Sequence, residues 1–295
     1  MAIDILSRTQ GVTEDLLALG TIPGGRLTLT SGNPEPQADV VGATGLWYTP
    51  HVSGVIPLWD GTRWRNVEFG PTGLSASLLS NSTFPHDVFG VLSSGQLALE
   101  FLSWTNTTAR ASAVGIQGKY VKGSDKTRAL LGTVMPSGSG TLEDSANRRL
   151  VCNLYNAVMR SLARLEFSST SEWAYTTAAW RAANNNGNNK VEIVNVVPRW
   201  LQAWVRASAL SYSNFNALGM VGVGIDSTTT PSGVRASAYR QPSTLEYVTL
   251  SADYSGILSA GYHTVNWIEW GPDGSNVYKN TIAGTQSGLG GNIFT

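Results

Sequence analysis

The sequence predicts a mainly β protein in which many short strands are joined by tight turns. Only 14% of the 295 residues are charged, against about 25% in a typical protein, and 32 residues are glycine. Helix-forming Glu and Lys are therefore scarce, whereas turn-forming residues are abundant. Short apolar segments that alternate with polar residues recur along the chain and are bounded by turn residues, as in β-strands.

Composition and charge exclude several classes of function. Lys and Arg together number 20, as do Asp and Glu, so no net field would gather nucleic acid or hold the chain on an anionic membrane. Cys152 is the single cysteine and permits neither an intrachain disulfide nor a Cys-rich metal site. No apolar run approaches the roughly 18 residues needed to span a bilayer. We expect no nucleic-acid partner, no membrane insertion, no metal and no cofactor.

Residues 1–25 are expected to be a short attachment segment. Thr13 and the two acidic residues after it would start a short helix, and Gly20 would end it.

Residues 26–160 predict a small β module. The segments 55–59 and 62–65 flank Asp60 and Gly61, a pair that tolerates positive φ, and so predict a hairpin with a type I′ turn. A second hairpin is expected around the Ser-Gly pair at 94–95.

The same module is expected to contain one helix, over residues 143–158. Thr141 can cap it, and acidic residues in its first turn would favour the helix dipole. Apolar residues recur there every four positions: Ala146, Leu150, Leu154 and Val158.

Residues 161–295 predict a C-terminal β-sandwich or jelly-roll-like domain, because short apolar segments alternate with turns. Strands are expected at Leu165, 173–180, 191–197, 201–209, 220–225, 245–250 and 264–270. The Asn-rich run 184–189 would be a long exposed hairpin loop, since Asn and Gly tolerate left-handed backbone conformations.

The segment from Gly25 to Phe69, GRLTLTSGNPEPQADVVGATGLWYTPHVSGVIPLWDGTRWRNVEF, resembles one that recurs in tail-fibre and other virion proteins of tailed phages. DVFGVLSSGQLALEFLSWTNTTARA and EDSANRRLVCNLYN are also similar to that family, so the resemblance covers about residues 25–157. This chain has Trp47, His51 and Trp59 where the family has Tyr-like residues. The resemblance implies a homotrimeric virion module with nothing catalytic in it, fastened to other virion proteins through residues 1–25.

Aromatic residues and Asn gather in the C-terminal part, which suits sugars, because apolar sugar faces stack on rings while hydroxyls bond to amides and carboxylates. The candidate carbohydrate-binding residues are Trp173, Trp180, Asn185, Asn186, Asn188, Trp267, Trp270 and Asp273. Trp is also the largest core residue, and for any one of these tryptophans core packing is the commoner role.

No catalytic constellation is evident in the sequence. His51, His86 and His263 are isolated and lack metal-ligand spacing, and no G-x-S-x-G motif occurs. Carboxylates that could form a glycosidase pair have no distinguishing context: Glu166, Glu172, Asp226, Glu246, Asp253, Glu269 and Asp273. We therefore expect a protein that is not an enzyme.

Together these observations favour a structural fibre or spike subunit on the surface of a phage or phage-like particle. Strands with sparsely charged faces would complete their burial between identical copies, and residues 161–295 would bind host cell-surface polysaccharide. Two alternatives stay open. One is a virion-borne capsule depolymerase or esterase, and the other is a decoration or adaptor protein that contacts another virion protein.

Overall fold

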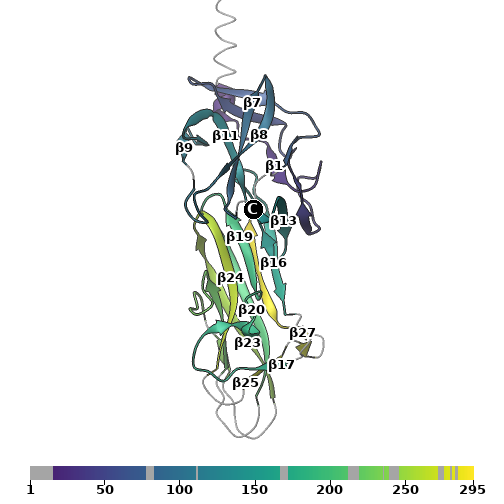
Figure 1. Cartoon of the computed structure of the whole chain (residues 1–295), viewed down its shortest axis with the longest axis vertical. Helices are drawn as coiled ribbons and strands as arrows, with labels where there is room; N and C mark the ends of the chain where they lie inside the picture. Colours follow the sequence, from purple (N-terminus) through teal and green to yellow (C-terminus); the bar gives the residue numbers. More distant parts are fainter. Residues whose placement is uncertain are drawn as a thin grey trace, which may run out of the picture.

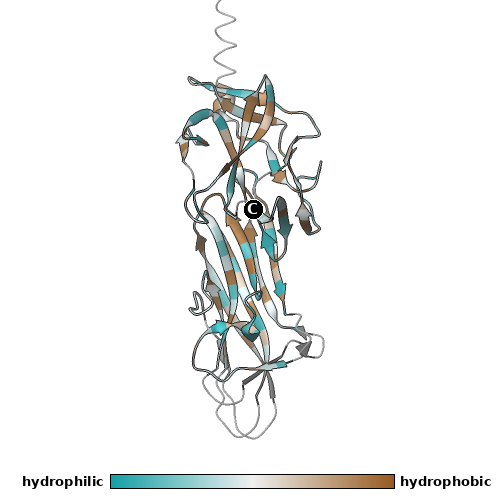
Figure 2. Cartoon of the chain, in the orientation of Figure 1, coloured by the Kyte–Doolittle hydropathy of each residue, from teal (hydrophilic) through white to brown (hydrophobic). Residues whose placement is uncertain are grey.

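A computed structural model describes residues 16–77, 83–110, 112–166, 172–211, 219–234, 236–238, 246–271, 276–279, 281–282 and 285–295. Strands dominate, which confirms the mainly β prediction. The molecule is elongated, with the N-terminal β module at one end and a β-sandwich below it along the same axis (Figure 1). Hydrophobic residues are spread along the strands of both parts (Figure 2).

The N-terminal module consists of two sheets and a hairpin around one apolar core. The first sheet contains β1 (Gly25–Thr28), β3 (Gly45–Pro50) and β6 (Leu74–Ser77). The second has the order β8 (Gln96–Ser103), β7 (His86–Ser93), β11 (Asp125–Val134), β10 (Lys119–Lys122) and β9 (Ala113–Ile116), and β15 (Val151–Asn153) pairs with β11. The core between them includes Leu27, Leu46, Ile56, Val88 and Leu131.

Both predicted hairpins are confirmed. β4 (Val55–Trp59) and β5 (Trp64–Glu68) are antiparallel, with Trp59 edge-on to Trp64 at 5.5 Å between ring centroids. Their connection is a four-residue loop, wider than the type I′ turn expected, because the Asp60 carboxylate accepts the backbone N–H groups of Thr62 and Arg63. The β7–β8 connection is a two-residue turn in which both residues have positive φ.

The predicted helix over 143–158 is wrong. That stretch forms β13 (Thr141–Ser145), β14 (Arg148–Arg149) and β15, and β16 (Met159–Leu165) follows. Val151 faces the module core and Cys152 faces a second cluster, so β15 is buried on both sides. A strand buried on both faces carries a continuous apolar run, which also satisfies a helical period.

The C-terminal sandwich packs two sheets face to face. One has the order β12 (Pro136–Gly138), β13, β14, β19 (Lys190–Asn195), β24 (Gly261–Trp270), β21 (Gly219–Ile225) and β22 (Ala236–Ala238), with β2 (Val40–Ala43) on β13 and β18 (Arg181–Ala182) on β24. The other has the order β16, β28 (Gly288–Phe294), β20 (Arg199–Ser211), β25 (Asn276–Lys279) and β17 (Glu172–Ala174), with β23 (Glu246–Leu258) along β20. Both inner faces contribute to one core, including Ile193, Val223 and Trp267 opposite Leu201 and Leu289.

A small hairpin of β26 (Thr281–Ile282) and β27 (Thr285–Gln286) completes the described strands. The predicted strand over 173–180 is present only at its start, as β17; residues 175–180 lead without regular structure to β18. The predicted division at residue 160 stays a prediction. That position lies inside β16, and β14 pairs in parallel with β19 across it.

Residues 16–20 are helical, as expected for the end of the short N-terminal helix, while residues 1–15 lie outside the described part of the chain. Ala18 is buried with Trp64 and Val121 of the module. The Lys119 ammonium donates to the Leu19 carbonyl at 2.6 Å and lies over the Trp64 ring. This helical turn is therefore held against the β module. Within the described residues, no helix has the length and apolarity to cross a membrane.

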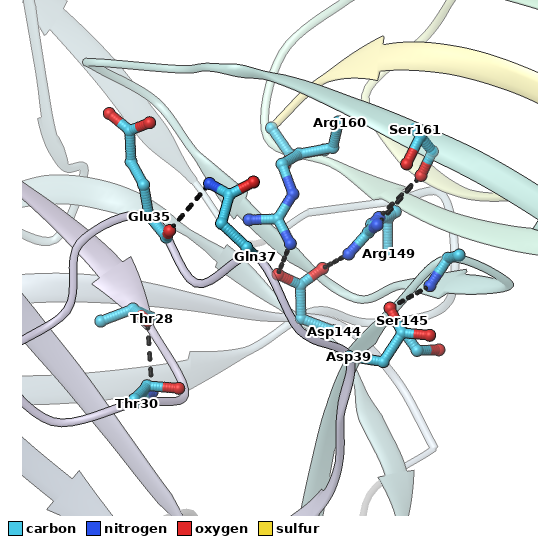
Figure 3. A network of polar contacts seen from close by, with 12 residues as sticks. Thr28, Thr30, Glu35, Gln37, Asp39, Asp144, Ser145, Arg149, Arg160 and Ser161 are labelled. Carbon is cyan, nitrogen blue, oxygen red and sulfur yellow. Dashed lines mark hydrogen bonds and ion pairs between the residues drawn. The ribbon is translucent and has the colours of Figure 1, made fainter.

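Arginine side chains join the module to the sandwich. Buried Arg26 on β1 donates to the carbonyls of Pro34 at 3.0 Å and Thr295 at 3.2 Å. Within the sandwich, Arg149 on β14 donates to the Ser161 carbonyl on β16 at 3.0 Å, which joins the two sheets, and pairs with Asp144 at 3.0 Å. Figure 3 shows that Arg160 approaches the same carboxylate from β16, so Asp144 lies between two guanidinium groups.

Asn153 contributes side-chain amide hydrogen bonds near this junction, in addition to the arginine contacts. Its buried side-chain amide accepts from the Leu27 N–H at 2.6 Å and donates to the Leu27 carbonyl at 3.2 Å. The side chain thus pairs with β1 as a neighbouring strand would. Arg199 of the sandwich donates to the Asn153 carbonyl at 2.8 Å, so one residue connects both parts.

We predict that Asn153→Ala lowers the free energy of unfolding by about 2 to 4 kcal/mol, because a buried N–H and a buried C=O lose their partners. Urea denaturation of the full chain measures this change. Asn33→Ala, which removes an exposed amide, should change stability by less than about 0.5 kcal/mol. Equal effects of the two substitutions would contradict the role assigned to Asn153.

Candidate functional site

The region farthest from the module is the place to look for the predicted binding site. β24 begins at Gly261, beside the Thr107 carbonyl of the module, which accepts the Tyr262 N–H at 2.9 Å. It ends at Trp270, roughly 30 Å farther along at about 3.4 Å per residue. Residues 181–182, which pair with the end of β24, therefore lie well away from the module.

Glu269, near the end of β24, is a fully buried carboxylate that accepts three hydrogen bonds and forms one ion pair. Trp173 of the opposite sheet donates its indole N–H at 2.6 Å. Arg181 donates through Nε at 2.8 Å and forms an ion pair through Nη2, also at 2.8 Å. The Asn184 backbone N–H donates at 3.1 Å. Glu269 therefore links the two sheets and the start of the Asn-rich run.

Burial raises the pKa of Glu269, and the Trp173, Arg181 and Asn184 donors oppose that rise. Arg181 is itself held in place, because its guanidinium lies 3.8 Å from the centroid of the Tyr175 ring. The Tyr175 hydroxyl donates to the Ala179 carbonyl at 2.7 Å, which folds the intervening segment back on itself. The Glu269 carboxylate is thus the centre of a hydrogen-bond network that holds residues 173–184 in place.

The Asn-rich run 184–189 is not a hairpin loop, contrary to the prediction. β18 and β19 are both antiparallel to β24 and lie along the same edge of it, whereas β21 occupies the other edge. The run therefore leaves the sheet edge and returns to it in the same direction. Asn184 and Asn185 have φ values of 56° and 50°, so the predicted left-handed conformations are confirmed.

Buried contacts fix both ends of this run. Asn184 is bound to Glu269, and at the other end the buried Asn189 side chain donates to Glu166 and to the Ala183 carbonyl. The Asn189 carbonyl also accepts the Trp267 N–H at 2.9 Å. Between these anchors, Asn185 and Asn188 are exposed and Asn186 is partly exposed. Their amides are thus presented on a constrained backbone.

The structure separates the four candidate tryptophans into two groups. Trp267 is 0% exposed and Trp173 is 8% exposed, and they pack edge to face in the sandwich core. A sugar-stacking role for these two is wrong. Trp180 and Trp270 are half-buried. Asp273 lies outside the described residues.

Trp180 and Trp270 are associated with the outer face of the sheet. A Cβ at Gly222 would lie 3.2 Å from the Trp180 ring and 3.1 Å from Ile268, so Trp180 covers a strand position that has no side chain. Trp270 follows Ile268 by two residues on β24 and so shares its face. The described part of the predicted site thus reduces to these two rings and the Asn-rich run.

Sequence reasoning missed Arg181 and Tyr175 as the groups that order this region. Glu269 was weighed only as a possible glycosidase carboxylate. The sequence feature that points to Glu269 is its place between two large apolar residues, Ile268 and Trp270, in a strand expected to be buried. A charge buried in such a strand needs partners.

A Ser–His–Asp arrangement lies elsewhere, at the turn between β23 and β24. His263 Nδ1 is 2.8 Å from an Asp226 carboxylate oxygen, and Nε2 is 3.3 Å from the Ser259 hydroxyl. Nε2 is also 3.1 Å from the Ser259 carbonyl, which only accepts hydrogen bonds. An imidazole that donates at both nitrogens is protonated and is a poor general base. The arrangement therefore fixes a turn more readily than it activates a serine.

Two cavities lie outside the region around Glu269. A cavity of 390 Å³ lies beside the β4–β5 hairpin, with Trp59 and Leu92 in its wall. A more polar cavity of 280 Å³ lies at the junction, bordered by Glu35, Arg149 and Arg160. Across the described ranges, no three His, Cys, Asp or Glu side chains are grouped closely enough to hold a metal ion.

Comparison with known proteins gives no relative from which a function can be transferred. No family model matches the sequence, and the comparison with curated proteins found no significant match. Among solved structures, the crystal structure of a Bacillus thuringiensis Cry1Da tryptic core variant aligns over 96% of this chain and 53% of that chain, with 10% identity and a TM-score of 0.20. This chain spans about half the length of that one, and so low a TM-score carries no argument about fold or function.

We predict that Glu269→Gln lowers stability by about 3 kcal/mol, because Arg181 loses its buried counter-charge and an amide N–H₂ faces other donors. Amide hydrogen exchange at 184–189 should accelerate at the same time. Urea denaturation and exchange mass spectrometry measure the two effects. Glu68→Gln on exposed β5 is the control, with an expected change below about 0.5 kcal/mol. Unchanged protection of the Asn-rich run would refute this role for Glu269.

A pH dependence should follow from His263. Hydrogen bonding to Asp226 raises the pKa of His263 against the opposing effect of burial, and that of Asp226 is lowered in return. Because the folded pKa exceeds the unfolded one, the protonated pair stabilises the fold below about pH 6.5, and this contribution is lost as pH rises through the folded pKa.

His263→Gln should therefore destabilise the protein more at about pH 5.5 than at about pH 9. The expected difference is about 1 kcal/mol, since the carboxylate is half-exposed. When His263→Gln is made in a chain that already carries Asp226→Asn, its destabilising effect should be the same at the two pH values. Equal destabilisation by His263→Gln at both would contradict the ion pair.

Proposed function

We propose that this chain is a non-enzymatic structural subunit of a fibre or spike on a phage or phage-like particle. In this proposal the chain forms a homotrimer, is attached to other virion proteins through residues 1–25, and binds host cell-surface carbohydrate with the outer end of its C-terminal sandwich. The likeness of residues 25–157 to phage virion modules is one support. The arrangement of the molecule along a single axis is the other.

The observation that carries the binding role is that two half-buried tryptophans and an anchored run of asparagines both belong to the end of β24 that lies away from the module. Trp180 and Trp270 belong to the outer sheet face, about one strand length from the junction with the module. Ring faces of this kind stack on the apolar side of a sugar. Asn185 and Asn188 supply exposed amide donors and acceptors for hydroxyl groups.

The contacts of Glu269 favour binding by this surface. A loop that is already ordered loses less conformational entropy when a ligand binds. The Asn-rich run is anchored at Asn184 and Asn189 before any sugar arrives. Single sites of this size are expected to be weak, and three parallel copies would convert weak binding into avidity.

Glycan arrays probed with the full-length chain test the proposal. We expect binding to a host surface polysaccharide, and about tenfold weaker binding by Trp180→Ala, the loss expected for a contact of about 1.4 kcal/mol. Trp59→Ala, in the module at the other end, is the matched control and should bind normally. Because removal of a half-buried ring can destabilise the sandwich, Asn185→Ala with Asn188→Ala gives a second, surface-only variant.

Two outcomes would refute this function. One is an array on which the wild type binds no glycan. The other is glycan binding that Trp59→Ala weakens as much as Trp180→Ala does. Immunogold electron microscopy of the particle tests the location separately, with label expected on projecting fibres or spikes. Label confined to the host cytosol would contradict it.

A further inference from the structure

Four large apolar side chains stand in one exposed row across the second sheet of the sandwich. Met159 on β16 pairs with Phe294 on β28, and Trp200 on β20 pairs with Ile257 on β23. Because Ile293 pairs with Leu201, the register places Phe294 next to Trp200. The exposed fractions along the row are 62%, 46%, 51% and 65%.

The row is on the outside of the sandwich. The residues next to it along the strands, Leu201, Ile293 and Leu258, point into the core and are at most 3% exposed. Strand alternation then places every second residue of these four strands on the outer face. A cross-strand row of exposed apolar residues buries its area only when another surface covers it.

Most other positions of this outer face carry small or polar side chains, with Leu165 and Trp204 as the large apolar exceptions. Beyond the apolar row its positions are Ser161, Ala163, Leu165, Asn292, Gly290, Gly288, Gln202, Trp204, Arg206, Ser255, Asp253 and Ser251. A Cβ at Gly290 would lie 2.7 Å from the Trp204 indole nitrogen, so that ring lies over a glycine. The two charged groups of the face, Arg206 and Asp253, pair with each other at 3.0 Å.

We propose that this outer face of β16, β28, β20 and β23 is the surface through which copies of this chain associate, with the Met159–Phe294–Trp200–Ile257 row at its centre. The proposed function includes association between copies of the chain, and this proposal, which rests on it, names the surface that they use. It requires neither carbohydrate binding nor a virion.

Charge identifies a second copy as the occupant. Surfaces that recognise a different partner commonly carry an excess of one charge that meets its opposite. Here the face carries only the internal Arg206–Asp253 pair, so copies of this face can gather around a three-fold axis without like-charge repulsion. The chain as a whole is also neutral, with equal numbers of basic and acidic residues.

The face alone is smaller than a standard interface between copies. Four strands about 4.8 Å apart and four outward rows about 6.8 Å apart cover roughly 500 Å². A standard interface buries about 800 Å² on each partner. The face is therefore the central part of an interface, with flanking residues completing it.

Analytical ultracentrifugation of the full-length chain tests the proposal. The wild type should form a homo-oligomer at micromolar concentration, and Trp200→Lys with Ile257→Lys should weaken association at least about 30-fold, as for loss of a central interface contact. Val41→Lys with Val52→Lys is the matched control, because Val41 on β2 and Val52 in the module are 70% and 72% exposed, lie outside this face, and should leave assembly unchanged when replaced. A monomeric wild type, or an oligomer that resists the Trp200 and Ile257 substitutions, would overturn the proposal.

Cross-linking keeps the test decisive if the double lysine variant does not fold. Cys152 is buried, so Ile257→Cys introduces the one exposed thiol of the chain, and Val41→Cys does the same on β2, outside this face. A short bis-maleimide should join copies through residue 257 and not through residue 41. Cross-links through residue 41 alone would overturn the proposal.

The outcomes also separate this inference from the proposed function. A dimer joined through this face supports the interface and contradicts the homotrimer. A trimer that assembles by this face but binds no glycan supports the interface and contradicts carbohydrate binding.

Discussion

Arginine-to-carbonyl contacts at the junction are the constraint on which the rest of the structure depends. Arg26 and Arg199 each donate to a backbone carbonyl across the place where the module meets the sandwich. Burial lowers the pKa of Arg26 to about 10, which still leaves the guanidinium charged at neutral pH. Such charge-assisted bonds are stronger than neutral ones. They join two separate cores in a fixed line, so that the end of β24 is held far from the N-terminal module.

The fold was largely predictable from local signals, and the exceptions have one physical cause. Low charge and abundant glycine indicated short strands, and the turn at 94–95 marked its hairpin because its residues adopt positive φ. The helix expected at 143–158 failed because β15 is buried on two sides, by the module core and by the junction cluster around Cys152. Burial on both sides depends on tertiary contacts, which periodicity does not record.

The candidate site shows the same limit. Residue type identified tryptophans suited to sugars, but burial decides their role: Trp267 fills the core, while Trp180 rests on the bare position at Gly222. Glu269 positions its neighbours through Arg181 and through Trp173 of the opposite sheet, both of which are far from it in sequence. Pairings of this kind follow from strand register, and register was not available from the sequence.

The molecule combines two β parts in line, a sheet face with an exposed apolar row, and a far end that carries aromatic rings. We infer that the two β parts form one rigid body. Spin labels at Thr62→Cys in the module and Asn188→Cys in the sandwich test it most directly by pulsed electron paramagnetic resonance, with few labelled chains diluted among unlabelled ones; Cys152 is buried and should not react. The account predicts a single narrow distance distribution. A broad or two-peaked distribution would contradict it.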